Sequence, residues 1–375
     1  MTGQTSKKLL ESDIDLAYLK SSTKLCRVLA QEPDESVKLT NRWNRVAIIT
    51  DGSGIPGMGD IGPLPALPYV ESKALIYKKL ADIEAFPLVL ASQNIDEIVR
   101  TVTILAPSVG AINLEGISES RCLEIKNRLM EQNDLPVFQD NMDAIPIVCL
   151  AALLNALKLV KKSIGEVSIV ISGSDAEATP IVEFLAEAGA VDIIVCDRAG
   201  AIHRGRPGYT NWVMEELAQK TNPRQVKGDH AQALIGADVY LSLSGPPVLN
   251  AELISTMNPH AILFYLSDCT PELFSRRDFH DKPTVVATTC PALPNQLTNC
   301  LVFPGLLRGA IDAMAKIINM PMKMAATLSL ANMISADNLD YELIIPQVLR
   351  PDLVPTMAKA VSDAAKATGV SQLRA

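Results

Sequence analysis

The sequence is poor in aromatic residues, histidine and paired cysteines. Phe, Trp and Tyr make up 4% of its 375 residues, and only four histidines are present. Those histidines (His203, His230, His260 and His280) share no spacing typical of metal ligands. The seven cysteines form no C-x-x-C pair, which favours free thiols in a reducing cytoplasm over a disulfide-bonded or zinc-binding protein.

Basic clusters and long apolar stretches are also missing. The net charge is −8, and no run of like charges occurs, which argues against a nucleic-acid partner. Residues 1–12 are polar, so no signal peptide is predicted there. The longest apolar run, residues 144–154, is too short to cross a bilayer. We therefore expect a cytoplasmic protein that binds neither nucleic acid nor membrane. Its 48% hydrophobic content can fill the cores of two domains.

Strand patterns alternate with helix patterns along most of the chain. Strands are predicted at residues 46–50, 86–90, 111–114, 136–138, 167–171, 191–195, 239–244, 262–266 and 285–288, and helices at 67–80, 96–105, 121–131, 144–161 and 179–190. This alternation predicts an α/β fold with parallel sheets covered by helices on both faces. We expect Asp143 to cap the long helix 144–161, and a Gly-dense loop at residues 51–62 to approach a ligand closely.

The segment 166–197 reads as the strand–turn–helix–strand unit of a dinucleotide-binding domain. Gly173 and Ser174 begin the turn, and Asp197 closes the second strand, where such folds contact the ribose of NAD. In the G-x-G-x-x-G pattern, Asp175 replaces the second glycine and Ala178 the third. A carboxylate at Asp175 competes with phosphate for the N–H groups of the helix start. The sequence therefore predicts a Rossmann-like, doubly wound domain with weakened binding of NAD or NADP.

Over nearly its whole length, the chain resembles the small bacterial malic enzymes. The matching pieces are Leu16–Tyr18, Asp51–Gly52, Gly57–Leu64, Lys73, Ala81–Ile83, Ile112–Glu115, Lys158–Val160, Thr221–Pro223, Pro294–Gln296, Phe303–Gly305 and Arg308–Ala310. The resemblance implies an α/β protein of two domains. These are an N-terminal malic-enzyme-type domain at 1–143, a connecting helix at 144–162 and a Rossmann-like NAD(P)-binding domain with C-terminal helices at 163–375.

The resemblance also implies a reaction. Malic enzymes oxidise malate with NAD(P), hold a divalent metal on the substrate and decarboxylate the resulting 2-oxo acid. By the match, Lys73 is the base at the hydroxyl group and Tyr18 protonates the enol. Asn295 and Asp268 fall at substrate-binding positions, although Asp268 stands where the family has Asn. A homodimer is implied as well, in which Tyr18 can reach the neighbouring subunit's site.

The metal ligands depart from the family pattern. The family has Glu-Asp at one strand end and a further Asp later, whereas this chain has Glu115-Gly116 and Asn141 after Asp140. Mg²⁺ and Mn²⁺ are held mainly by carboxylate oxygens. Glu115 and Asp140 remain as candidate ligands, and Asp143 is a possible replacement. We predict a weak metal site.

Three functions stay open at this stage. The chain can be a divergent malic enzyme acting on a small carboxylate with NAD or NADP. It can be a repurposed enzyme of the same fold, using Lys73 and Tyr18 for metal- and NAD-independent proton transfer as a decarboxylase, lyase or tautomerase. It can also be a noncatalytic homologue.

Overall fold

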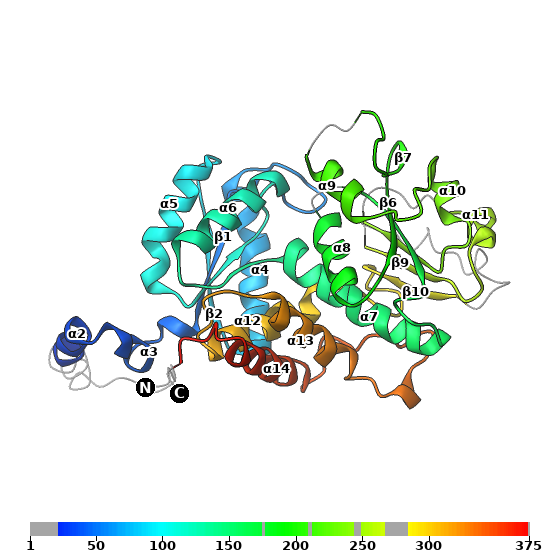
Figure 1. Cartoon of the computed structure of the whole chain (residues 1–375). Coiled ribbons are helices and arrows are strands. Elements are labelled where there is room, and N and C mark those ends of the chain that lie inside the picture. The colour runs from blue at the N-terminus through cyan, green and yellow to red at the C-terminus, as the bar shows by residue number, and fades with distance from the viewer. Residues whose placement is uncertain (1–21, 175–176, 209–211, 244–248, 267–283, 374–375) are drawn as a thin grey trace.

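The computed structural model describes residues 22–174, 177–208, 212–243, 249–266 and 284–373. Three residues proposed above, Tyr18, Asp175 and Asp268, lie outside the described residues. Figure 1 shows two sheets side by side, each with its own helices, and a long helix, α7 (Ile145–Val160), that begins near the centre and runs below the second sheet.

The first sheet has four parallel strands in the order β2-β1-β3-β4. Their bounds are β1 (Arg45–Thr50), β2 (Glu84–Val89), β3 (Ala111–Leu114) and β4 (Val137–Gln139), and the flanking helices are α4 (Pro63–Ala81), α5 (Ile95–Leu105) and α6 (Glu119–Gln132). Along β1, Val46 and Ile48 join one core, whereas Ala47 and Ile49 join another. The sheet is thus buried on both faces, as its continuous apolar runs predict. Helix α4 starts before the predicted residue 67, because Pro63 suits a first helical turn.

The second sheet has six strands in the order β10-β9-β8-β5-β6-β7, all parallel except β7. The strands are β5 (Ser168–Ser172), β6 (Asp192–Asp197), β7 (Gly200–Ala201), β8 (Val239–Ser242), β9 (Ile262–Tyr265) and β10 (Val285–Thr288), and the helices are α8 (Ala178–Glu187), α9 (Trp212–Lys220), α10 (His230–Leu234) and α11 (Ala251–Thr256). The strand order reverses direction at β5, which makes its carboxyl end the expected ligand position of a doubly wound sheet. The sequence analysis missed β7 and helices α9 to α11.

The start of α7 differs from the prediction. A π-helical turn, Asp140–Ala144, precedes the helix, and the Gln139 side chain caps this turn by accepting a hydrogen bond of 2.8 Å from Met142 N. The N-cap role predicted for Asp143 is therefore wrong, because that residue lies inside the turn. The stretch Asp140–Val160 is long and apolar enough to cross a membrane by composition, but 72% of its most apolar window is buried within the protein. Its composition is that of a core helix.

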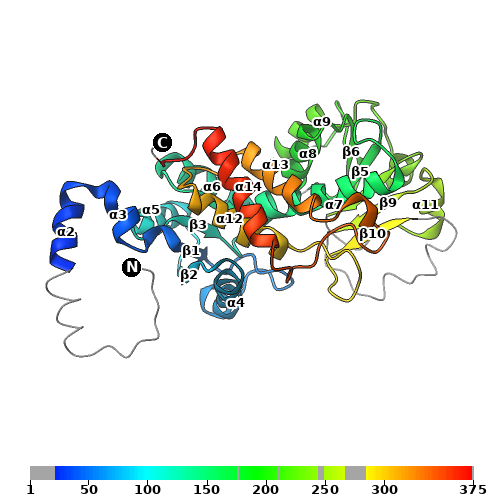
Figure 2. The same cartoon turned by 90° about the horizontal axis from the view of Figure 1, so that it is seen from below.

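Three C-terminal helices return from the second sheet to the first. They are α12 (Phe303–Asp312), α13 (Met320–Ala331) and α14 (Leu353–Ala367), and they lie below the first sheet and the centre of the molecule in Figure 1. The Phe303 ring meets Tyr77 of α4 edge-on at 4.7 Å between centroids, and Arg308 donates to Asn44 Oδ1 at 2.5 Å. At the other end of the chain, α2 (Ser22–Gln31) and α3 (Ser36–Leu39) project away from the body in Figure 2.

Candidate active site

Helix α4 directs three polar side chains to one face. Tyr69, Lys73 and Tyr77 are spaced by four residues, which places them above one another on a helix. Lys73 is buried, and its Nζ contacts both Glu115 Oε2 and Asp140 Oδ2. The Tyr69 hydroxyl donates to the second oxygen of Glu115 at 2.8 Å. A buried lysine therefore lies between two carboxylates, one of which also holds a tyrosine.

The sheet brings the two carboxylates together. Glu115 directly follows β3, and Asp140 directly follows β4, the parallel neighbour of β3. The carboxyl ends of adjacent parallel strands meet at one edge of the sheet, so these residues converge although they are far apart in the chain. Phe303 of α12 covers the lysine, with Nζ 4.7 Å from the ring centroid. This aromatic face stabilises the ammonium ion where water is excluded.

The charges within this cluster shift one another's pKa values. Burial lowers the pKa of Lys73, but Asp140 and Glu115 outweigh burial and leave that pKa raised. Burial raises the pKa of Glu115, but Lys73 outweighs it and leaves that pKa lowered. Burial, together with the charge of Glu115, raises the pKa of Asp140 to about 8. Lys73 is therefore a stable cation, and Asp140 is the group in the cluster that holds a proton near neutral pH.

A cleft of about 730 Å³ opens over this cluster. Glu115, Asp140 and Tyr69 line it from the first sheet, while Glu177, Leu243 and Leu266 line it from the second. Lys73 lies behind the carboxylates and is not part of the wall. Among the described residues, the wall has no Lys, Arg or His side chain. Asp140 is the member of the cluster best placed to exchange a proton with a bound molecule.

The Gly-dense loop 51–62 forms another wall of the cleft and is packed rather than free. Gly54 N donates to Gly116 O at 2.9 Å, and a Cβ on Gly54 would lie 2.7 Å from the main chain of Ile117. A Cβ on Gly52, whose φ is +72°, would lie 1.9 Å from Gly62 O. Glycine is therefore required at Gly52 and Gly54 so that the loop can fold onto the chain after β3.

The residues present do not fit a divalent metal ion. Gly116 supplies no side-chain oxygen, and its φ of +58° strains any residue with a side chain. The amide of Asn141 donates to Glu177 Oε1 at 2.5 Å. Glu115 and Asp140 are both in contact with Lys73 Nζ. In the described part of the chain, no three His, Cys, Asp or Glu side chains are grouped as metal ligands.

Asp143 lies three residues beyond Asp140 in a separate cluster. Its carboxylate pairs with Lys126 at 2.7 Å and with Lys323 of α13 at 2.6 Å, and it accepts from Gln139 N at 2.8 Å. Burial raises the pKa of Asp143, but the two lysines outweigh this and lower it to about 2. The replacement ligand considered from the sequence is thus engaged by two ammonium groups.

The dinucleotide turn follows β5 as predicted. Gly173 has φ +122°, and its N–H donates to Cys196 O of β6 at 2.9 Å, so only glycine suits this turn. Ser174 follows, and α8 begins at Ala178, where the Glu177 side chain makes no capping hydrogen bond. The N–H groups at the start of α8 are therefore not capped by that carboxylate. This arrangement fits the pyrophosphate of a dinucleotide.

Asp197 lies at the end of β6, on the ribose side of the predicted cofactor site. Its carboxylate faces Arg206 through both oxygens, with Oδ1 3.0 Å from Nη1, and it also accepts from Ala199 N at 2.8 Å. Asn295, the predicted substrate contact, has its amide bound to main chain at Val286 O (3.0 Å), Tyr341 O (2.8 Å) and Ile344 N (2.9 Å). It does not line the cleft over Lys73.

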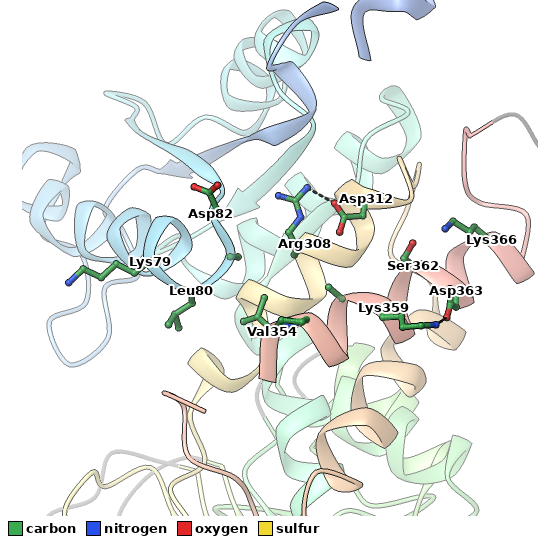
Figure 3. Close-up of a pocket in the computed structure, with 13 residues that line it drawn as sticks. Lys79, Leu80, Asp82, Arg308, Asp312, Val354, Lys359, Ser362, Asp363 and Lys366 are labelled. Carbon is green, nitrogen blue, oxygen red and sulfur yellow. Dashed lines mark hydrogen bonds and ion pairs between the residues drawn. The ribbon is translucent and has the colours of Figure 1, made fainter. Parts of the chain in front are cut away.

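A second cavity, of about 590 Å³, lies between the end of α4 and helices α12 and α14 (Figure 3). Its charged residues are largely paired with one another. Arg308 contacts Asp312 at 2.7 Å, and Lys359 contacts Asp363 at 2.6 Å. None of the predicted site residues lines it. The candidate chemistry therefore belongs to the cleft over Lys73.

The sequence analysis missed Tyr69 and Tyr77 as neighbours of Lys73. Tyr69 lines the cleft, and Tyr77 is buried behind it with its hydroxyl donating to Asn113 Oδ1 at 2.8 Å. Their spacing of four residues on either side of Lys73 was the available signal, because it places all three on one helix face.

Comparison with known proteins identifies the family. The family model for the malic enzyme N-terminal domain matches residues 17–95, and the model for the malic enzyme NAD-binding domain matches residues 283–366. The chain is 39% identical to an NAD-dependent malic enzyme of Geobacillus stearothermophilus, over 96% of this chain and 75% of that protein. It is 37% identical to a bifunctional malic/malolactic enzyme of Bacillus subtilis, over 96% and 88% of the two chains.

Solved structures agree with this assignment. The crystal structure of an NAD-dependent malic enzyme from Thermotoga maritima superposes with a TM-score of 0.89 at 35% identity, covering 96% of this chain and 95% of that one. The malic enzyme of Pyrococcus horikoshii gives a TM-score of 0.91 at 32% identity, covering 100% and 88%. The resemblance seen in the sequence is confirmed, as are the two-part α/β fold and the NAD-binding domain. The chain belongs to the malic enzyme family.

Proposed function

We propose that the chain oxidises and decarboxylates malate or a related 2-hydroxy acid, with NAD or NADP as hydride acceptor. The observation that carries the proposal is the buried Lys73–Glu115–Asp140 cluster beneath the cleft between the two sheets. Perturbed, buried acid–base groups at a cleft are typical of catalytic sites. Relatives named as NAD- and NADP-dependent malic enzymes support both the substrate class and the cofactor.

In the proposed reaction, the base is Asp140 in place of Lys73, the base implied by the family resemblance, because the raised pKa of Lys73 keeps it charged. Asp140 takes the hydroxyl proton of the substrate in its deprotonated form, which a pKa of about 8 makes available as the pH rises, while Lys73 holds the positive charge behind it. NAD or NADP, when bound, would supply the hydride acceptor. The Lys73 ammonium then stabilises the negative charge that develops on the substrate oxygen as carbon dioxide leaves. Tyr18 returns a proton to carbon, a role that rests on the family resemblance. Glu115 keeps both Lys73 and Tyr69 in place.

The same resemblance suggests how the cofactor and the substrate are held. Gly173, Ser174 and Ala178 would hold the pyrophosphate at the start of α8, and Asp197 would hold the ribose. The Asp175 carboxylate is expected to weaken this binding. We further propose contacts from Asn295 and Asp268 to the substrate side, a homodimer and a cytoplasmic location. The choice between NAD and NADP belongs to this proposal as well.

The test follows reduction of NAD and of NADP with malate as substrate, in the presence and absence of Mn²⁺. We expect slow but measurable turnover by the natural chain. The Lys73→Met variant should lose about a hundredfold, the lower end of acid–base contributions. Lys126→Met is the matched control, because it removes a buried lysine that pairs with Asp143 and not with Glu115 or Asp140. Absence of turnover with either cofactor would exclude the oxidative reaction.

A second function is favoured by one specific observation. The cluster keeps its lysine and two carboxylates, whereas Gly116, with a φ of +58°, and Asn141 supply no carboxylate to a metal ion. Such a site suits proton transfer that needs neither metal nor nicotinamide, as in a decarboxylase, lyase or tautomerase. Release of carbon dioxide from a 2-oxo acid without cofactor would identify this activity. If all assays are negative while the protein is folded, the chain is a noncatalytic homologue.

A further inference from the structure

One amide group joins the two walls of the cleft. Asn141 lies in the turn after β4, and its Nδ2 donates to Glu177 Oε1 at 2.5 Å and to Glu119 Oε1 at 3.5 Å. Glu119 begins α6 beside the first sheet, whereas Glu177 immediately precedes α8 beside the second (Figure 1). All three side chains line the cleft. We infer that Asn141 is a positioning residue, which holds the two walls together and keeps the Glu177 carboxylate off the start of α8.

The chemistry of the three groups requires a hydrogen-bond donor between the carboxylates. Ionised carboxylates only accept hydrogen bonds, whereas the amide nitrogen of Asn carries two N–H donors. Each of Glu119 and Glu177 can therefore take one donor of Asn141, which offsets the repulsion between their like charges. The Asp that the family has at this position offers no such donor and would add a third negative charge. The contact between the walls thus depends on the residue by which this chain departs from the family.

The same bond decides where the Glu177 carboxylate lies. Glu177 occupies the N-cap position of α8, yet its side chain makes no capping hydrogen bond with that helix. A helix start attracts a carboxylate, because its N–H groups and dipole present partial positive charge. Asn141 opposes that attraction by binding the carboxylate on the other wall, which leaves the start of α8 open to an anionic ligand. The identity of this ligand, NAD or NADP, rests on the proposed function.

The helix itself does not depend on this bond. Its buried residues include Ala178, Ile181 and Phe184, which belong to the large core that also contains α7. Loss of the bond should therefore release the Glu177 side chain and leave α8 in place. Variants at Asn141 and Glu177 are thus expected to fold, which circular dichroism can verify.

Isothermal titration of the full chain with NAD tests the positioning role. The buffer contains EDTA, so that no divalent ion binds an added carboxylate. Asn141→Asp should weaken NAD binding at least about tenfold, because the new carboxylate repels that of Glu177 toward the start of α8. Asn141→Asp/Glu177→Gln exchanges donor and acceptor and should restore the affinity to within about threefold of the natural chain. Asn141→Asp/Glu119→Gln is the charge-matched control, and it should stay weak because two carboxylates still face each other across the cleft.

A second measurement needs no cofactor. In urea denaturation, the midpoint shifts of Asn141→Ala and Glu177→Ala should sum to more than the shift of the double variant, because each change breaks the same bond. Additive shifts would overturn the contact between the walls. Unchanged NAD affinity in Asn141→Asp, or equal recovery in the two charge-matched variants, would overturn the positioning of Glu177. If the natural chain binds neither NAD nor NADP, the proposed function fails, and the urea measurements alone decide whether Asn141 joins the walls.

Discussion

Asp140 and Asp143 lie in one π-helical turn, yet their surroundings are electrostatic opposites. Asp140 and Glu115 share one ammonium group, whereas Asp143 alone receives two, from Lys126 and Lys323. Both aspartates are buried, but the pKa of Asp140 is raised to about 8 and that of Asp143 is lowered to about 2. Burial acts in the same direction on both, so the neighbouring charges decide the difference.

The comparison separates reactivity from stability. Asp140 lines the cleft and carries a buried oxygen, Oδ1, with no hydrogen-bond partner in the described part of the chain. Asp143 does not line the cleft, and it ties α6 and α13 to the start of α7. The excess of negative charge makes the first cluster able to exchange a proton, and the excess of positive charge makes the second a fixed anchor.

The largest effect is expected from breaking the anchor. Asp143→Ala leaves two buried ammonium groups without their carboxylate, which typically costs about 3–5 kcal/mol of unfolding free energy. Urea denaturation followed by circular dichroism measures this loss. The matched control is Asp312→Ala, which breaks the partly exposed pair with Arg308 and should cost no more than about 1 kcal/mol. Equal losses in the two variants would contradict the anchor role.

The same anchor predicts the acid response. The pKa of Asp143 is lower in the folded protein than its usual value of 3.8, so its stabilising contribution is complete above about pH 4. That contribution is lost as the pH falls from about 4 toward 2. The natural protein should therefore lose more stability between these pH values than Asp143→Asn does. Acid titration of both proteins, with unfolding free energy measured at each pH, tests this difference. Equal losses would show that the anchor does not depend on the charge of Asp143.

A smaller effect on the free energy of unfolding is expected from Asp140→Asn. Near neutral pH this change replaces a carboxyl group that holds a proton, and it leaves the pair between Lys73 and Glu115 intact, so stability should change by less than about 1 kcal/mol. Turnover with malate should nevertheless fall about a hundredfold, because the proton acceptor is lost. Steady-state kinetics and urea denaturation of the same preparation separate the two quantities. A variant that is destabilised as much as Asp143→Ala would show that Asp140 is also an anchor.

Tyr69→Phe tests whether Tyr69 only positions Glu115 in the cluster of Lys73, Glu115 and Asp140. The variant removes the 2.8 Å hydrogen bond to Glu115, which is worth about 1 kcal/mol in a typical case. We expect a comparable loss of stability and a fall in turnover of no more than about tenfold, since Tyr69 is proposed to position Glu115 and not to react. Tyr77→Phe, which removes the buried bond to Asn113, is the matched control for stability. A hundredfold loss in Tyr69→Phe alone would make Tyr69 a reacting group.

The fold was predictable from the sequence, but the two clusters were only partly so. Each of the nine strands predicted from the sequence overlaps a strand of the structure, because buried parallel strands are continuous apolar runs. Lys73, Glu115 and Asp140 were identified through family motifs, without their mutual contacts. Lys323 belongs to a helix that follows the second sheet, and only the return of that helix brings it to Asp143. Local pattern therefore suggested a cap for Asp143, where long-range charge pairing prevails.

The smallest effect is expected at Asp197, the last residue of β6, which is also paired with a cation but is less buried than Asp140 and Asp143. Arg206 contacts both carboxylate oxygens of Asp197. Burial raises the pKa of Asp197, but Arg206 and the Ala199 N–H outweigh burial and leave that pKa lowered. Arg206→Gln should free the carboxylate to accept the ribose hydroxyls, tightening NAD binding about threefold, or about 0.7 kcal/mol. NADP should bind more weakly, since its 2′-phosphate then meets an unpaired anion. Fluorescence titration of both cofactors measures the ratio, and Arg224→Gln, which pairs with Asp192 at the other end of β6, controls for loss of charge. An unchanged ratio would show that Asp197 does not contact the cofactor.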